Sequence, residues 1–405
     1  MPTSPILEKP AAPASATGST WRIISFVFFT FTTYISIGLP MAVLPAYVHL
    51  SMGMSVALAG LVISVQSVAT LISRPLTGRI CDRLGAKLTV LSGMGFNAAA
   101  GIILIAATLL HHIPWLCLFV LVLSRLALGF GESLCSTGAT LWGILSIGPS
   151  STAKVITYNG IATYGALAAG APIGVLLYQR WGLASIGLLT FLLCIACLGL
   201  GLRKAAVKAL PGEHMPFMAV LGRITPHGLS LAMGGIGYGV LATFITLFFA
   251  SRHWNGAALS LTIFGATFVL ARLLFLHTIE RRGGFIVAIG CLSVEALAML
   301  LLWQSSTPWM AFLGAALTGF GFSMVFPALG VEAVRCVSPQ NRGSALGIFN
   351  AFSDVTFFLN GPVAGAIIGA YGYPSVFLYA LISVLVALGI AISLYRKQFR
   401  QAAEA

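Results

Sequence analysis

Residues 74–87 read Arg-Pro-Leu-Thr-Gly-Arg-Ile-Cys-Asp-Arg-Leu-Gly-Ala-Lys, a charged turn between two long apolar runs. Part of this turn returns 198 positions later as Arg272, Glu280-Arg281 and Gly283, in the same spacing and again between two apolar runs. A charged turn that is repeated once, half a chain apart, indicates a protein built from two related halves. Because long apolar runs flank each copy, both halves are expected to lie in a lipid bilayer.

The composition is that of an integral membrane protein. Of the 405 residues, 58% are hydrophobic and 8% are charged, whereas about 25% of the residues of a soluble domain are charged. A helix needs about 20 apolar residues to cross roughly 30 Å of hydrocarbon. The chain has twelve runs near this length, at about 22–48, 56–76, 88–109, 114–144, 155–178, 183–202, 226–250, 257–278, 285–303, 309–333, 344–371 and 374–395. These are not short alternating segments, which argues against a lipid-facing β-barrel. The predicted fold is all-α with twelve membrane-spanning helices; eleven is the alternative, because only Gly372 and Pro374 separate the last two runs.

Basic residues predict the orientation of these helices. The formal net charge is +13, but Lys and Arg are distributed between the apolar runs, which does not predict a nucleic-acid partner. If the N-terminus is cytoplasmic, all of the 22 Lys and Arg except Arg125, Arg180 and Arg252 fall at or near the cytoplasmic side, in agreement with the positive-inside rule. Both termini are therefore predicted to be cytoplasmic, which requires an even number of spans and favours twelve.

Polar segments divide the chain into two six-helix bundles. The predicted organisation is a disordered cytoplasmic tail at 1–20, a first bundle at 21–204, a cytoplasmic linker at 205–224, a second bundle at 225–397 and a cytoplasmic tail at 398–405. The tail at 1–20 is rich in Pro, Ala, Ser and Thr, a composition typical of disorder. The first apolar run is too long for a signal-peptide core, so it is expected to be a retained span.

Two further echoes support the duplication. Gly-Phe-Gly occurs at 129–131 and again at 319–321, an offset of 190. Pro172 and Pro362 are separated by the same offset. Duplicated six-helix halves are an architecture of secondary transporters, which bind their substrate between the halves near the membrane midplane.

Three short motifs give the chain a family resemblance. The loop 2–3 motif of the Major Facilitator Superfamily is similar to the turn formed by Gly78, Asp82, Arg83, Gly85 and Lys87. Residues 125–131 resemble the helix-four motif of that family, and 170–174 loosely resemble a helix-five motif of drug/proton antiporters, in which Gly is usual at the place of Ala171. From about residue 21 to 397 the chain resembles a twelve-helix member of this superfamily, and more narrowly its bacterial YhhS-type branch. The resemblance implies a monomeric secondary transporter of the bacterial inner membrane that works by alternating access.

Three acidic residues lie inside predicted spans: Glu132, Glu295 and Asp354. An ionisable group at bilayer depth is costly and is therefore a functional candidate. Glu132 follows Arg125 by seven positions, so both lie on one side of a helix about 10.5 Å apart, and water, another helix or substrate must mediate between them. Through the resemblance, Asp354 is expected opposite helix four and Glu295 on the periphery. We predict Glu132, Asp354 and Arg125 as proton-coupling residues; the alternative is that they only tie helices together.

The remaining candidates fall into three groups. Polar and aromatic side chains in the spans are predicted to line a substrate cavity: Tyr34, Gln66, Trp142, Asn159, Tyr164, Tyr238 and Asn350. The charged turns are predicted to form gating contacts, or only to enforce topology, through Gly78, Asp82, Arg83, Gly85, Lys87, Glu280, Arg281 and Gly283. Gly170, Pro172, Gly174, Gly361 and Pro362 are predicted to shape the packing of helices five and eleven. Arg74 and Arg272 are expected at helix ends, with their side chains extended to the membrane surface.

The predicted function is secondary transport of a small organic molecule, with protons and the lipid bilayer as the other partners. A proton-coupled exporter is favoured over a proton-coupled importer of a small polar metabolite. A membrane-embedded enzyme is disfavoured, because the sequence has neither clustered nucleophiles nor metal-ligand spacing. No nucleotide-binding P-loop is present, so the energy is expected to come from a proton gradient, without cofactor or metal.

Overall fold

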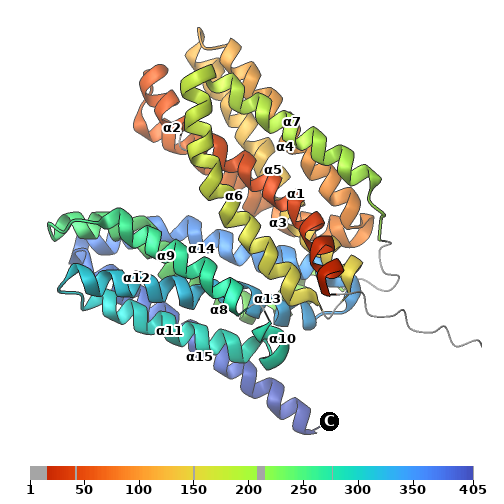
Figure 1. Cartoon of the computed structure of the whole chain (residues 1–405), viewed down its shortest axis with the longest axis vertical. Coiled ribbons are helices and arrows are strands. Elements are labelled where there is room, and N and C mark those ends of the chain that lie inside the picture. The colour runs from red at the N-terminus through yellow and green to blue at the C-terminus, as the bar shows by residue number, and fades with distance from the viewer. Residues whose placement is uncertain (1–15, 42, 149–150, 208–214, 276, 405) are drawn as a thin grey trace, which may run out of the picture.

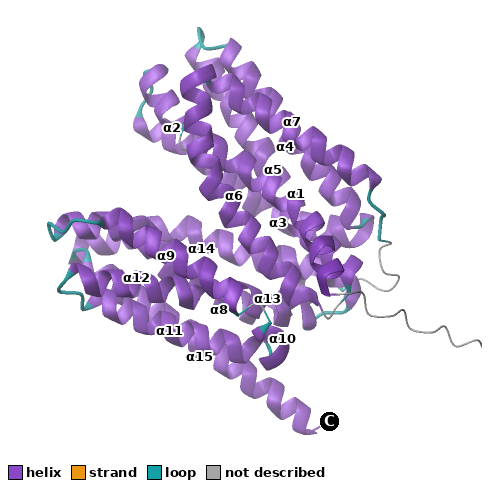
Figure 2. Ribbon diagram, in the orientation of Figure 1, coloured by secondary structure: helices purple, strands orange, loops and turns teal. Residues whose placement is uncertain are grey.

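The computed structural model describes residues 16–41, 43–148, 151–207, 215–275 and 277–404. These ranges contain helices and no strand (Figure 2). Within them, eleven helices are long and apolar enough to cross a membrane, and a further apolar helix, Leu259–Leu274, is shorter. The prediction of an all-α membrane protein is therefore confirmed.

The first half is a bundle of six long helices. Its elements are α1 (Ala16–Met41), α2 (Leu44–Ala46), the π-helical turn η1 (Tyr47–Ser51), α3 (Val56–Leu84), α4 (Ala86–Leu109), α5 (Pro114–Ile147), α6 (Thr152–Trp181) and α7 (Leu183–Arg203). The first predicted run thus consists of one long helix and two short elements. Pro40 near the end of α1 and Pro45 within α2 lie on either side of this break, as expected of residues that lack a backbone N–H.

The second half repeats this arrangement. Its elements are α8 (Phe217–Ser251), α9 (Ala257–Leu274), α10 (Thr278–Arg282), α11 (Gly284–Trp303), α12 (Pro308–Ser323), α13 (Val325–Arg335), the 3-10 turn η3 (Pro339–Asn341), α14 (Arg342–Tyr371) and α15 (Pro374–Glu404). The tenth predicted run is split between α12 and α13 at Met324. Pro327 explains the split, because it has no N–H to donate to the carbonyl of Ser323 four residues earlier.

Three predicted boundaries differ from the structure. Residues 217–224 belong to α8 instead of the linker, because Val220 and Ile224 are buried one helical turn apart and give this polar stretch an apolar face. Residues 16–20 and 398–404 are helical extensions of α1 and α15 instead of tails. The rest of the predicted N-terminal tail, and 208–214 of the linker, lie outside the described residues.

The two bundles are inclined to each other and diverge toward one side of the molecule (Figure 1). They contact each other mainly between α3 and α14, with smaller contacts of α6 with α13 and α9. The start of α1 and the end of α15 both lie on the side where the bundles converge (Figure 1). We call this side the closed end and the opposite side the open end.

The two charged turns have matching backbone geometry. Gly85 connects α3 to α4 with φ +90°, and Gly283 connects α10 to α11 with φ +82°. Residues with a Cβ rarely adopt this left-handed region without strain. The repeated glycine therefore allows the same sharp reversal between two spans in each half.

Candidate functional site

A central cavity of about 530 Å³ lies between the two halves. The first half contributes residues of α1, α3, α5 and α6, and the second half contributes residues of α8, α9, α12, α13 and α14. Of the residues predicted for proton coupling and for the substrate cavity, the wall contains Tyr34, Glu132, Asn159, Tyr164, Tyr238, Asn350 and Asp354. Side chains more than 300 positions apart in the sequence thus line one chamber.

Trp142 is not part of this wall, which corrects the prediction. Its indole is completely buried within the first half, where it packs on Phe26 and Phe29 with ring centroids 5.2 and 5.7 Å away. The indole Nε1 donates a hydrogen bond of 3.2 Å to the carbonyl of Ala205. Thr140, two residues earlier on the same helix, lines the cavity, whereas the indole of Trp142 packs inside the first half and supports the chain that leaves α7.

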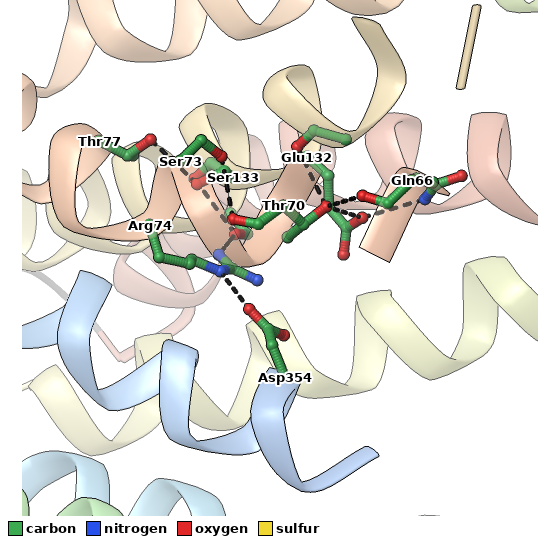
Figure 3. Close-up of polar contacts among 10 residues, drawn as sticks. Gln66, Thr70, Ser73, Arg74, Thr77, Glu132, Ser133 and Asp354 are labelled. Carbon is green, nitrogen blue, oxygen red and sulfur yellow. Dashed lines mark hydrogen bonds and ion pairs between the residues drawn. The ribbon is translucent and has the colours of Figure 1, made fainter. Parts of the chain in front are cut away.

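Arg74 lies inside the molecule instead of at the membrane surface. Its Nε donates to Asp354 Oδ2 at 2.7 Å (Figure 3). Its Nη1 donates to Ser136 Oγ at 2.5 Å. Arg74 is 3% exposed and Asp354 is 21% exposed. The predicted second span stopped at residue 76, but α3 continues to Leu84, which places Arg74 about 15 Å before the helix end. A buried ion pair therefore joins α3 of the first half to α14 of the second.

Gln66 lies behind the cavity wall and connects Arg125 to Glu132. Arg125 Nη1 donates to Gln66 Oε1 at 3.3 Å, and Gln66 Nε2 donates to Glu132 Oε2 at 3.0 Å. Thr70 also donates to this carboxylate oxygen at 3.0 Å (Figure 3). Water, another helix or substrate was expected to mediate between Arg125 and Glu132. The structure shows that another helix, α3, does so through Gln66. Arg125 itself is buried outside the cavity wall.

The second half contributes a cluster of aromatic rings to the cavity wall. Tyr238 of α8 stacks on Phe264 and on Phe322, each with a centroid distance of 5.2 Å, and meets Phe357 edge-on at 5.6 Å. Phe322 lies 190 positions after Glu132, the offset that relates the two halves. The duplication has therefore diverged within the cavity, where an acidic position has an aromatic counterpart.

Arg272 also faces the cavity instead of the membrane surface. It is 2% exposed and belongs to the cavity wall contributed by α9. It lies eleven residues before Gly283, as Arg74 lies eleven residues before Gly85. The two matched arginines are thus the functional candidates that the sequence analysis missed, although their shared offset of 198 was the signal that could have identified them.

At the closed end, Asp82 binds the first turn of α14 in the other half. Its Oδ1 accepts from the Gly343 backbone N–H at 2.7 Å, and its Oδ2 accepts from the Ser344 N–H and Oγ–H at 2.8 and 2.6 Å. A carboxylate at a helix N-terminus satisfies free N–H groups and interacts favourably with the helix dipole. Gly78 allows this approach, because a Cβ there would lie 2.7 Å from the Ser344 Cα.

The repeated turn of the second half makes a weaker contact with the first half. Glu280 of α10 pairs with Lys154 of α6 in the first half at 3.6 Å, with side chains 25% and 28% exposed. Arg83 and Arg281 are exposed. Lys87 stays within the first half, where it donates to the carbonyls that end α7, Leu202 and Lys204, at 2.9 and 2.6 Å. Contacts between the halves at this end therefore involve the two acidic residues, Asp82 and Glu280.

The predicted helix-packing residues have different surroundings in the two halves. Gly170 and Gly174 of α6 lie against the backbone of Gly38 and Leu39 in α1, so a larger residue would separate these helices. Gly361 of α14 has no heavy atom within 4 Å of where a Cβ would be, and it belongs to the cavity wall. The prediction of close packing is wrong for Gly361, since four-residue spacing does not specify a partner helix.

The two prolines and Glu295 complete the set of predicted residues. Pro172 and Pro362 lie inside α6 and α14. Glu295 of α11 is completely buried outside the cavity wall, and a Cβ on Gly237 or Gly321 would contact its side chain. Glu295 thus lies in the interior of the second half, and not on the periphery where the resemblance placed it.

Comparisons with known proteins agree with this architecture. The family model described as Major Facilitator Superfamily matches residues 26–283 and 227–404. The chain is 49% identical over 391 residues to an uncharacterized MFS-type transporter of Burkholderia pseudomallei (strain 1106a), which covers 96% of each protein. It is also 49% identical over 391 residues to an uncharacterized MFS-type transporter of Pseudomonas aeruginosa (strain UCBPP-PA14), covering 96% of this chain and 97% of the relative.

Solved structures share the fold at low sequence identity. The transporter FucP in its outward conformation has a TM-score of 0.75 and 16% identity, covering 91% of this chain and 97% of that structure. A bacterial homologue of the iron transporter ferroportin, in its outward-facing state with soaked iron, has a TM-score of 0.77 and 13% identity, covering 93% and 98%. The family model, the relatives and the two-bundle fold lead to one conclusion: the chain belongs to the Major Facilitator Superfamily and has the fold of a multi-pass membrane transporter.

Proposed function

We propose that the protein is a proton-coupled exporter of a small organic molecule, acting as a monomer in the bacterial inner membrane with both termini in the cytoplasm. The observation that carries this proposal is the ion pair between Arg74 and Asp354, which joins the two halves inside the cavity. Any process that neutralises Asp354 weakens a contact that exists only while the closed end stays closed. A proton is the simplest such agent, because it converts the carboxylate into a neutral acid.

The placement of the acidic residues supports a direction for the exchange. In the state described here the bundles diverge at the open end, which the charge bias assigns to the outside (Figure 1). A proton that enters from that side reaches Asp354 through the cavity, since this side chain is partly exposed there. Loss of the ion pair then favours opening of the closed end, where the proton leaves and substrate enters. Reformation of the pair returns the loaded transporter to the outward-open state.

Glu132 extends this coupling within the same cavity. Its Oε2 is held by Gln66 and Thr70, so the carboxyl group has a fixed place beside the route to Arg74. Among the described residues, the hydrogen bonds that connect Arg125 to Glu132 pass through Gln66. We therefore assign proton binding to Asp354 and Glu132, and a positioning role to Arg125.

Reconstituted protein provides the test. Purified protein is first screened against metabolites and drugs by thermal shift, and the hits are added to proteoliposomes that contain a trapped pH-sensitive dye. Antiport moves protons out of the lumen as substrate enters, so the lumen becomes more alkaline, whichever way the protein is inserted. Symport acidifies the lumen. Substrate uptake without a change of luminal pH would show that protons are not coupled.

Two conservative variants identify the proton sites. In Asp354→Asn and Glu132→Gln the side chain keeps its size but cannot exchange a proton. We expect each variant to bind the substrate but to lose the luminal pH change. If both variants retained the pH change of the unmodified protein, the assignment of these two carboxyl groups would be wrong.

A further inference from the structure

We propose that Arg272 is the anion-binding group of the central cavity, and that the transported molecule is a small organic anion with an apolar or aromatic body. This inference rests on the proposed function only in taking the central cavity as the substrate site. It requires neither proton coupling nor a direction of transport. Arg272 lies on α9, on the wall of the second half.

The guanidinium is held in place by two backbone carbonyls. Its Nε donates to the carbonyl of Ser323 at 3.1 Å, and its Nη1 donates to the carbonyl of Thr157 at 3.2 Å. The Ser323 carbonyl is free to accept because Pro327, four residues later, has no N–H. A Cβ on Gly160 would collide with Nη1, so the group fits against α6 only because this residue is glycine. The arginine is thus fixed at the boundary of the two halves.

In the described part of the chain, no carboxylate neutralises the charge of this arginine. None of the ion pairs found among the described residues includes Arg272, and within the same ranges no hydrogen bond from its Nη2 is found. Backbone carbonyls are neutral dipoles and leave the net charge in place. A buried guanidinium without a counter-ion is unfavourable, and a planar anion can satisfy several of its N–H groups together. The free nitrogen therefore provides a place for an anionic group of the ligand.

The duplication gives an internal comparison for this reading. Arg272 corresponds to Arg74 at an offset of 198, and Tyr164 corresponds to Asp354 at an offset of 190. In one half the arginine meets a carboxylate across the interface at 2.7 Å. In the other half the matching residue is a tyrosine, whose ring centroid lies 5.8 Å from the guanidinium carbon. The positive charge that Asp354 neutralises in one copy is therefore left for a ligand in the other.

The surroundings of Arg272 indicate the rest of the ligand. The Phe268 ring lies 4.6 Å from the guanidinium carbon, and Tyr164 packs edge-on to Phe268 at 5.0 Å. Phe268 is itself buried behind the cavity wall, but Tyr164 and the stacked pair of Tyr238 and Phe322 belong to that wall. Such rings bind apolar or aromatic groups through dispersion and stacking. A carboxylate or phosphate attached to an apolar body matches this wall.

An equilibrium binding assay tests the inference with defined probes. Full-length protein in detergent is titrated with benzoate, benzamide and benzylamine, which share a ring and differ in charge, and affinity is measured by calorimetry. We expect benzoate to bind at least about tenfold more tightly than either other probe, because a charge-assisted hydrogen bond contributes roughly this factor or more. Benzoate binding that is no tighter than benzamide binding would overturn the proposal.

Four substitutions at two positions separate an anion site from a structural tie between the halves. Arg272→Gln removes the charge and should abolish the preference for benzoate, whereas Arg272→Lys should retain part of it. Loss of Arg272 would also remove its bonds to the backbone at the interface, so Tyr164→Asp is the stronger test. This substitution keeps Arg272 and gives it a carboxylate counter-ion, as Arg74 has in Asp354. Its matched control is Tyr164→Asn, which has the same size and no charge.

The outcomes are distinct. Tyr164→Asp should weaken benzoate binding about tenfold or more relative to Tyr164→Asn, with equal benzamide binding in both. Arg252→Gln, which removes an exposed arginine outside the cavity, should leave the benzoate preference unchanged. Equal benzoate binding in the two Tyr164 variants, or a preserved preference in Arg272→Gln, would show that Arg272 only ties the halves together. A benzoate preference without proton-coupled transport would support the anion site and refute the exporter.

Discussion

The ion pair between Arg74 and Asp354 should determine which fraction of the protein molecules has the closed end closed. Asp354→Asn keeps the shape of the side chain and removes its charge. Loss of one partner of a fully buried pair costs about 3–5 kcal/mol, whereas exposed pairs contribute about 0–1 kcal/mol. With Arg74 3% exposed and Asp354 21% exposed, and with the asparagine oxygen still able to accept from Nε, we expect a loss of about 2 kcal/mol. This corresponds to a roughly 30-fold shift toward the state that is open at that end.

Distances between spin labels measure this shift. Labels attached to unnatural amino acids at Arg83 and Arg282, two exposed positions on the charged turns of the two halves, should move apart when the closed end opens. In the unmodified protein we expect the short distance to dominate. In Asp354→Asn the ratio of the long-distance to the short-distance population should increase roughly 30-fold.

A second ion pair between the halves provides the control. Lys154 and Glu280 lie 3.6 Å apart with side chains 28% and 25% exposed, so Glu280→Gln should shift the populations by less than about 1 kcal/mol. The reasoning is refuted if Asp354→Asn leaves the distance distribution unchanged. It is also refuted if Glu280→Gln shifts the distribution as strongly, because burial would then not decide the strength of the contact.

Two further substitutions test the closed end and the interior of the first half. Gly78→Ala places a Cβ 2.7 Å from the Ser344 Cα, so it should push α3 away from α14 at a cost of about 1–3 kcal/mol. The distance between the labels at Arg83 and Arg282 should then increase. Gly60→Ala is the control on the same helix, because its Cβ would have no heavy atom within 4 Å, and it should leave that distance unchanged. Trp142→Phe removes the hydrogen bond to Ala205, worth about 1 kcal/mol, so it should lower the thermal midpoint and leave ligand affinity unchanged; reduced affinity with an unchanged midpoint would contradict the structural role.

The gating turns show how far the sequence could be read. Asp82, which the sequence analysis placed in a charged turn with gating contacts, makes three hydrogen bonds to the start of α14. The partner helix lies more than 250 residues away, and nothing in the local sequence identifies it. Lys87 belongs to the same motif but caps α7 within its own half. A motif therefore identified a turn with polar contacts, and the packing of the bundles assigned each contact.

The two cavity arginines show what was misread and why. Arg74 was expected near a helix end because hydrophobicity falls after residue 76, yet α3 continues to Leu84. The charged turn at the helix end is itself helical, so composition marked the end of the apolar stretch and not the end of the helix. Trp142 was predicted to line the cavity but lies in the packed interior of the first half. The sequence could not separate these two places, because an aromatic residue in a span suits both equally well.

Sequence alone determined the all-α membrane fold and its duplication, and it predicted the number and the orientation of the spans. These properties depend on apolar length and on the distribution of basic residues, which act within one helix and its flanking turns. Only the tertiary structure decided which helix faces the cavity with which side chain, and which arginine keeps a carboxylate partner. In a soluble protein the apolar face of a helix identifies its interior side, but lipid makes the outer face apolar as well. The inward faces of Arg74 and Arg272 were therefore set by contacts between α3, α6, α9 and α14, which no periodicity in the sequence records.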